Sequence, residues 1–213
     1  MVYVSSVMQR GRVVFPEHTG ERIYMKPFRK VDVNLGRWTE TVAMMMEGID
    51  TDAECYLMVD QGMGQTRRPG KHIDGYWNPG LSAHGIGNRH TPMPSGGHGS
   101  RNNIHSPVPA PSWGPSPTSI RDRWADAPFD QPEDILLASS YEGAVGYKGI
   151  YGGKIGDMGD CRHIDAPWLA KVALQAGNTY ALNVTGLHES LPIDPSIPRT
   201  IVRINVPGWS HLQ

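Results

Sequence analysis

Apolar and polar positions alternate over much of the chain, and this pattern predicts a protein built mainly of β-strands. The alternation is clearest in residues 172–204, where a turn and a Pro-rich loop separate three strand-like segments. In the middle segment Tyr180, Leu182 and Val184 recur at every second position, so they share one face. A Gly-Asn pair at residues 177–178 is a typical hairpin-turn signal between the first two segments.

Other parts of the chain show the same two-residue period. Residues 54–60 form a strand-like segment in which Cys55, Leu57 and Val59 lie on one face. Further short strands are expected at residues 13–15, 22–25 and 133–142, and a Gly-rich hairpin is expected over residues 143–153.

One segment has a helical period instead. Over residues 37–47 the apolar side chains of Trp38, Val42, Met45 and Met46 fall at helical spacing, and a glycine follows directly. The methionines are better explained by adaptable packing of this helix on a sheet than by a soft-metal site.

Composition narrows the class of protein. The 213 residues are expected to form one domain (1–213), and 25 Gly and 18 Pro favour a loop-rich β fold over a helical bundle. The 20 basic and 21 acidic residues argue against a long nucleic acid as the dominant partner, although a local basic groove stays open. The N-terminus lacks the apolar run of a signal peptide, no stretch of about 20 apolar residues indicates a membrane span, and the two cysteines read as free thiols. We therefore expect a cytoplasmic protein.

A long segment in the middle of the chain departs from the alternating pattern. Residues 78–119 are poor in apolar side chains and rich in Pro, Gly, Asn, Ser and His. A loop of this length in a compact domain is usually functional, so we interpret it as an insertion that forms a lid or an interaction loop. The spacing of its histidines matches no compact metal motif; these are His84, His90, His98 and His105.

Three side chains with metal-ligating chemistry can meet in this arrangement. His72 and Asp74 are two residues apart, so in an extended segment they point to the same side. We expect His188 to close the second strand of residues 172–204 and Arg199 to open the third, with both facing one cavity. Two imidazoles and one carboxylate on one side of a metal form the facial triad of non-haem Fe(II) oxygenases.

These residues and their surroundings resemble the Fe(II)/2-oxoglutarate-dependent dioxygenases. The shared pattern is an H-x-D motif, a distal histidine near the end of a strand, and an arginine roughly ten residues later; here Arg199 follows His188 by 11 residues. The similarity covers residues 55–206. It implies a double-stranded β-helix of the jelly-roll or cupin type, with one or two outer helices.

The resemblance also implies a function and a set of site residues. It implies an iron-dependent hydroxylase in which His72, Asp74 and His188 bind Fe(II), with O2 and 2-oxoglutarate as cosubstrates and an unidentified substrate. Arg199 is expected to pair with the far carboxylate of 2-oxoglutarate, and Arg203, four residues on and on the same face, is the second choice. Tyr180 is expected either to donate its hydroxyl to the cosubstrate or to pack in the core. Near the substrate entrance the expected residues are Tyr76, Trp77 and Asn78.

The tripeptide His-Ile-Asp occurs twice, so the choice between the copies depends on spacing. A jelly roll has to fit about four strands, roughly 45 residues, between the ligand pair and the distal histidine. Asp165 precedes His188 by only 23 residues, whereas Asp74 precedes it by 114. We therefore assign the metal to the first copy and expect the second, at residues 163–165, to mark a strand end and a turn.

Two alternatives from other classes stay open. The chain could be a structural or assembly protein with a jelly-roll body and no catalysis. It could also be a cupin-like metal protein that uses the same ligands without 2-oxoglutarate.

Overall fold

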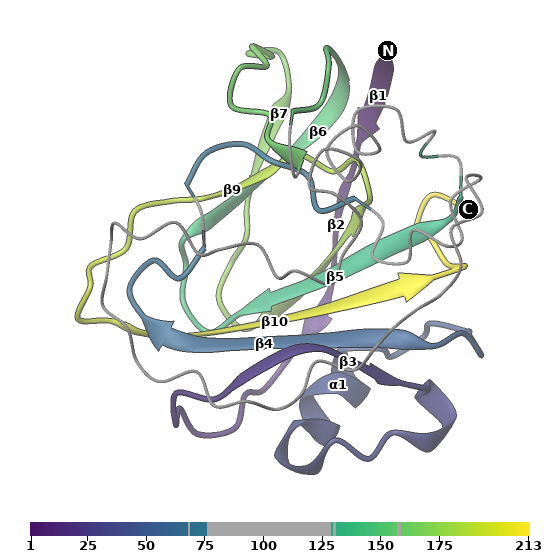
Figure 1. Ribbon diagram of the computed structural model, residues 1–213, viewed down its shortest axis with the longest axis vertical. Coiled ribbons are helices and arrows are strands. Elements are labelled where there is room, and N and C mark those ends of the chain that lie inside the picture. The colour runs from purple at the N-terminus through teal and green to yellow at the C-terminus, as the bar shows by residue number, and fades with distance from the viewer. Residues whose placement is uncertain (68, 76–128, 130, 157–158) are drawn as a thin grey trace, which may run out of the picture.

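Two antiparallel β-sheets form the framework of the part of the chain that the structure describes (Figure 1). The computed structural model describes residues 1–67, 69–75, 129, 131–156 and 159–213. Its strands are β1 (Val2–Ser5), β2 (Val7–Arg12), β3 (Arg22–Phe28), β4 (Cys55–Met63), β5 (Glu133–Ser139), β6 (Ala144–Gly152), β7 (Ala170–Ala173), β8 (Asn178–Asn183), β9 (His188–Ser190) and β10 (Pro198–Pro207). Its helical elements are the 3₁₀ turns η1 (Lys30–Asp32) and η2 (Gly36–Trp38) and the helix α1 (Thr39–Met45). The prediction of a mainly β protein is confirmed.

The larger sheet has the strand order β2-β8-β5-β10-β4-β3, with the longest strand, β10, between β4 and β5. Val202, Ile204 and Val206 of β10 lie in one hydrophobic core, whereas Arg199 and Arg203 line a cavity on the opposite face. Both faces of β10 are therefore buried, which explains why polar and apolar side chains alternate along it without either set reaching solvent.

The helix covers one face of the larger sheet. Figure 1 shows α1 beside β3 and β4. Trp38, Val42 and Met45 are buried, and they pack in the same core as Leu57 and Val59 of β4. This confirms the helix expected over residues 37–47, although its first turn is the 3₁₀ segment η2.

The smaller sheet has the order β1-β6-β7, and β9 pairs with β6 as well. The backbone around His72 extends this sheet, because His72 and His188 of β9 exchange backbone hydrogen bonds. From β4 onward the chain therefore passes repeatedly between the sheets: β5, β8 and β10 lie in the larger one, and β6, β7 and β9 lie in the smaller one.

Two expected hairpins are absent from the described residues, because each glycine signal serves another purpose. Gly177 has a positive φ of 70°, but its turn connects β7 to β8, and these strands belong to different sheets. The glycines after residue 143 lie mostly within one strand, β6. A Cβ on Gly146 would lie 2.6 Å from Val7 Cγ2, so this glycine permits a close approach of the two sheets rather than a turn.

Three smaller expectations also need correction or stay untested. Residues 13–15 are not a strand, and the strand in that region is β2, which ends at Arg12. His188 does not close the second strand of the 172–204 region but opens β9, a separate strand of the other sheet. The expected insertion at residues 78–119 lies outside the described residues.

Both cysteines, Cys55 and Cys161, are buried and free, as the sequence predicts. Among the described residues, no helix combines the length and the apolar composition that crossing a membrane requires.

Candidate metal centre and adjoining pocket

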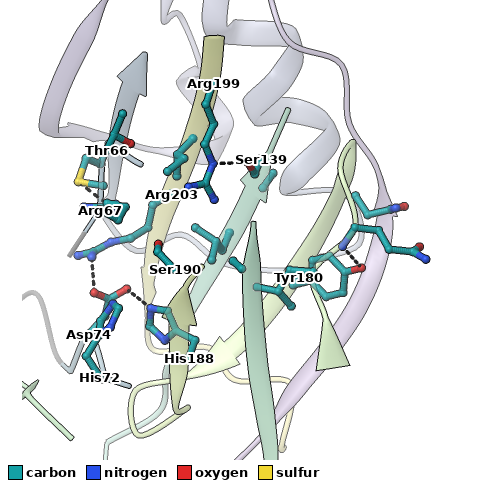
Figure 2. A pocket seen from close by; sticks show the side chains of 18 of the residues that line it. Thr66, Arg67, His72, Asp74, Ser139, Tyr180, His188, Ser190, Arg199 and Arg203 are labelled. Carbon is teal, nitrogen blue, oxygen red and sulfur yellow. Dashed lines mark hydrogen bonds and ion pairs between the residues drawn. The ribbon is translucent and has the colours of Figure 1, made fainter. Parts of the chain in front are cut away.

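Three side chains from distant parts of the chain converge between the two sheets. His72, Asp74 and His188 each offer one ligand atom, and these atoms lie within 4.8 Å of one another. The convergence starts in the backbone, since His72 N donates to His188 O at 2.9 Å and His188 N donates to His72 O at 3.0 Å. The prediction that the first His-Ile-Asp copy meets His188 is therefore confirmed as a geometric cluster, which Figure 2 shows at the lower end of the pocket.

Each imidazole is held by a nearby carbonyl through its Nδ1 atom. His72 Nδ1 lies 2.9 Å from Gly70 O, and His188 Nδ1 lies 3.0 Å from Gly186 O. Each carbonyl accepts a hydrogen bond from the imidazole, which keeps the proton on Nδ1 and makes Nε2 the ligating atom. Both histidines are thus oriented in the way that metal-ligating histidines usually are.

Glycines shape the backbone around the ligand pair. Gly70 adopts a φ of 84°, and a Cβ at this position would lie 2.6 Å from Arg162 Cγ. Gly159 adopts a φ of 77°, and its carbonyl accepts a hydrogen bond from Ile73 N at 2.9 Å. Ile73 is fully buried, so the residue between the two ligands is fixed by packing and by this bond.

The carboxylate of Asp74 lies among positive charges. Arg203 Nη1 is 2.7 Å from Asp74 Oδ1, and His188 Nε2 is 3.5 Å from Asp74 Oδ2. Burial alone would raise the pKa of Asp74, but the positive charges of Arg203 and then Arg67 counteract it and hold this pKa well below its usual range. Burial lowers the pKa of His188 more than Asp74 raises it. The site therefore favours an ionised carboxylate and a neutral imidazole, the forms that bind metal.

Arg203 is itself oriented by a chain of buried polar groups. Its Nε donates to Asn205 Oδ1 at 3.1 Å, and Asn205 Nδ2 donates to Glu133 Oε1 at 2.8 Å. Because Arg203 and Asn205 lie two residues apart on β10, both point to the same face of that strand. The guanidinium of Arg203 that contacts Asp74 through Nη1 is therefore held in position by a hydrogen bond through its Nε atom.

A cavity of about 390 Å³ adjoins the three ligands, and both sheets contribute to its lining. Its size lies in the range of small-molecule sites. Arg199 projects into it from the start of β10 (Figure 2), as predicted. The residue is only 2% exposed. Arg199 Nε donates to Ser139 Oγ at 3.0 Å, whereas its buried Nη1 has no hydrogen-bond partner among the described residues. Burial, and then the charge of Arg67, lowers the pKa of Arg199 to about 10, so it remains a cation at neutral pH.

Tyr180 of β8 lines the same cavity, but its hydroxyl is engaged by the connection from β7. The hydroxyl accepts a hydrogen bond from Gln175 N at 2.9 Å and lies 3.5 Å from Ala173 O. Its ring packs with Leu182 and Leu174. These contacts favour the core role that the sequence left open for this residue.

Several pocket residues were missed by reasoning from the sequence. Ser139 lies opposite Ile201 in the register of β5 and β10, which brings its hydroxyl within reach of Arg199 Nε, and no local sequence signal indicates this contact. Arg67 lies in an Arg-Arg-Pro-Gly-Lys segment just before the ligand pair, so its position in the sequence was a usable signal.

The second His-Ile-Asp copy does not join the cluster of ligand atoms, although it packs beside the first copy, where Lys71 Nζ donates to Ile164 O. His163 is exposed and its Nε2 lies 2.7 Å from Lys154 O, and Asp165 is exposed in a segment without regular structure. The expected substrate-entry residues Tyr76, Trp77 and Asn78 lie outside the described residues.

The arrangement has clear chemical capabilities. Two imidazole nitrogens and a carboxylate oxygen can bind a divalent transition metal from one side, which leaves the opposite side toward the cavity. Comparison with known proteins adds no constraint: no protein-family model matches the chain, and no curated protein or solved structure is significantly similar to it.

Proposed function

We propose that this protein is an Fe(II)- and 2-oxoglutarate-dependent oxygenase, most simply a hydroxylase. The observation that carries the proposal is the cluster of His72, Asp74 and His188 beside a buried arginine, Arg199, whose Nη1 has no partner among the described residues. The cluster supplies the ligands, and the arginine supplies the cation that a dicarboxylate cosubstrate requires.

The donor set fits ferrous iron. Two neutral imidazoles and one carboxylate with no thiolate match the ligand set of non-haem Fe(II) sites, and a mononuclear Zn(II) site with the same ligands is the competing assignment. Bound Fe(II) would supply the activation of O2 that an oxygenase requires. The protein's own contribution is to hold Asp74 ionised, to fix both imidazoles through Nδ1 and to enclose the reactants.

The strand order supports a double-stranded β-helix as the fold. In such a fold consecutive strands lie in opposite sheets, and here β5 and β6 do so, as do β7 and β8, β8 and β9, and β9 and β10. The metal ligands then lie at the smaller sheet, and Arg199 and Arg203 lie on β10 of the larger sheet. The two sets of side chains face one another across the interior.

Arg199 fits the role of cosubstrate anchor better than Arg203. Arg203 is already paired with Asp74, whereas Arg199 lines the pocket and its buried Nη1 has no hydrogen-bond partner among the described residues. A buried N–H without a partner is costly, and the far carboxylate of 2-oxoglutarate would satisfy it with a charge-assisted bond. Ser139 would hold the guanidinium in position through Nε.

The test is the visible charge-transfer band that forms under anaerobic conditions when 2-oxoglutarate chelates Fe(II) in the protein. We expect a weak band with wild-type protein. Asp74→Ala should abolish the band. Arg199→Gln should raise the 2-oxoglutarate concentration that is needed to form the band and leave the affinity for iron unchanged.

A matched control uses the second copy of the tripeptide. Asp165→Ala changes the equivalent residue of an exposed His-Ile-Asp segment and should leave the band intact. Far-UV circular dichroism of each variant checks that the sheets are retained. A wild-type protein that binds iron without giving the band with 2-oxoglutarate would contradict the proposal, as would normal iron affinity in Asp74→Ala.

A second candidate function is favoured by one observation. The ion pair between Arg203 and Asp74 satisfies the carboxylate without any metal, as expected of a jelly-roll structural protein. That reading predicts no metal in the purified protein and no binding of added Fe(II). A cupin-like metal protein that does not use 2-oxoglutarate would instead bind iron, and replacing Arg199 would not change that binding.

A further inference from the structure

The pocket contains a third arginine that the proposed reaction does not use. Arg67 is half-buried and lines the cavity beside Thr66 (Figure 2). Tyr24 and Met58 belong to the same lining. The Nη2 atom of Arg67 lies 3.7 Å from Met58 Sδ, and no described carboxylate lies within ion-pair distance of it. A thioether is a weak acceptor, so this guanidinium keeps most of its hydrogen-bonding capacity unused among the described residues.

The described residues that line the cavity also carry a net positive charge. The described lining has three cations, Arg67, Arg199 and Arg203, and one anion, Asp74, which leaves an excess of two positive charges with neutral histidines. Burial lowers the pKa of Arg67 and the charge of Arg203 lowers it further, opposed by the attraction of Asp74. This crowding of like charges is unfavourable unless anions enter the pocket.

Among the described residues, the nearby carboxylate of Asp60 does not remove this excess. Asp60 acts on both Arg67 and Arg199, but its Oδ1 is 3.2 Å from Arg22 Nε, so another arginine already balances its charge. A divalent metal ion would raise the excess to four positive charges, and the dianion 2-oxoglutarate would return it to two. A second anionic group would offset the positive charge that remains on the described lining.

We propose that the substrate carries an oxyanion, a carboxylate or a phosphate, and that Arg67 binds it. This inference rests on the proposed oxygenase function, because it assigns Arg199 to 2-oxoglutarate and Arg203 to Asp74. Arg67 then remains to orient the substrate beside the metal. A guanidinium suits this role because it can donate two parallel hydrogen bonds to either oxyanion.

The experiment measures binding to the anaerobic Fe(II)–2-oxoglutarate complex by calorimetry. The probes are matched pairs: small carboxylic acids with their primary amides, such as phenylacetate and phenylacetamide, and phosphate monoesters with their parent alcohols, such as phenyl phosphate and phenol. We expect charged members to bind at least tenfold more tightly than neutral ones. The arm that binds more tightly identifies the substrate as a carboxylate or a phosphate.

The variants separate Arg67 from a general charge effect. Arg67→Gln should weaken binding of the charged probes by roughly ten- to a hundredfold and leave neutral probes unchanged, and Arg67→Lys should restore part of the loss. The matched control, Arg12→Gln, removes an exposed arginine of β2 and should change neither. The band formed with 2-oxoglutarate should persist in every variant.

The two proposals fail in different ways. A missing band in wild-type protein would contradict the oxygenase function itself. If the band is normal, three binding results would contradict the Arg67 assignment alone. These are equal binding of charged and neutral probes, no binding of any charged probe, and an unchanged preference for charged probes in Arg67→Gln.

Discussion

Arg203 and Asp74 form a buried ion pair in which Nη1 contacts Oδ1 at 2.7 Å, while the other carboxylate oxygen, Oδ2, faces His188 Nε2 at 3.5 Å. The two oxygens therefore have separate roles. Oδ2 lies with the imidazoles, where it can bind a metal through one oxygen, and Oδ1 is held by a guanidinium that Asn205 and Glu133 fix in turn. The arginine orients the ligand and keeps it ionised.

This pair predicts that Arg203 controls metal affinity. Replacing Arg203 with Met keeps much of the side-chain volume but leaves Asp74 Oδ1 without its partner, so we expect Fe(II) affinity to fall by about ten- to a hundredfold. Arg203→Lys keeps the charge and should lose less. Competition with a chromophoric chelator measures the affinity. Equal or tighter metal binding in Arg203→Met would show that repulsion between Arg203 and the metal outweighs its orienting role.

Ser139 is expected to matter for 2-oxoglutarate and not for the metal. Ser139→Ala removes the acceptor of Arg199 Nε, a buried charge-assisted bond, and we expect the dissociation constant for 2-oxoglutarate to rise about tenfold. The matched control is Ser140→Ala, since Ser140 Oγ accepts a bond from Thr200 N in the same strand pair without touching Arg199. Titration of the charge-transfer band measures both. An equal effect of the two variants would contradict a specific role for Ser139.

Gly159 should be required for the position of the ligand pair. A Cβ at this residue would lie 2.2 Å from Ile73 O, so Gly159→Ala should both destabilise the fold and displace the backbone between His72 and Asp74. Gly20 has a nearly identical φ of 78° but nothing within 4 Å of such a Cβ, so Gly20→Ala should cost only the backbone strain, about 1 kcal/mol. Thermal unfolding and iron titration compare the two. Equal losses would mean that the contact with Ile73 is unimportant.

The buried thiol of Cys55 predicts a pH dependence of stability. Burial, and then the charges of Glu133 and Glu54, raises the pKa of Cys55 from 9.0 to about 12. Because the folded-state pKa is the higher one, the stabilising effect is complete below pH 9 and is lost as the pH rises toward 12. Between pH 8 and pH 10 the wild type should lose about 1 kcal/mol of unfolding free energy through this group.

The Cys55→Ala variant provides the comparison for that pH dependence. It should be less stable than the wild type at pH 8, because it loses packing in the core, but its stability should change less between pH 8 and pH 10. Urea denaturation at both pH values gives the difference. The same pH slope in both proteins would exclude Cys55 as its source.

How much of the fold follows from the sequence depends on the range of the interaction concerned. The helix, the strands β3, β4, β5 and β10, and the shared core face of Cys55, Leu57 and Val59 follow from local periodicity, because burial of one face imposes that period. The two expected hairpins were wrong because the same glycines that favour a turn also permit crossing between sheets and close packing. Only the pairing partners distinguish these cases.

The candidate site divides in the same way. The choice of His72, Asp74, His188 and Arg199 as candidates rested on the two-residue spacing of the first pair, on the 11-residue interval of the second pair and on the family resemblance. The expected strand end at His188 was wrong, because this residue opens β9. Ser139 could not be predicted, because its contact with Arg199 depends on the register between β5 and β10. Arg67 was visible as a basic segment, but its orientation into the cavity is a property of the packed structure.

The sequence by itself determined the β-rich class, the helix on the sheet and the side chains with metal-binding chemistry, since these depend on residue types and on spacings of a few positions. The tertiary structure alone decided which of the two arginines of β10 pairs with Asp74 and which keeps an Nη1 without a hydrogen-bond partner among the described residues, and it added a third cation beside them. The physical reason is that Coulomb interactions and hydrogen bonds between residues far apart in the chain depend on distances that strand pairing sets. Those distances exist only after the two sheets have packed.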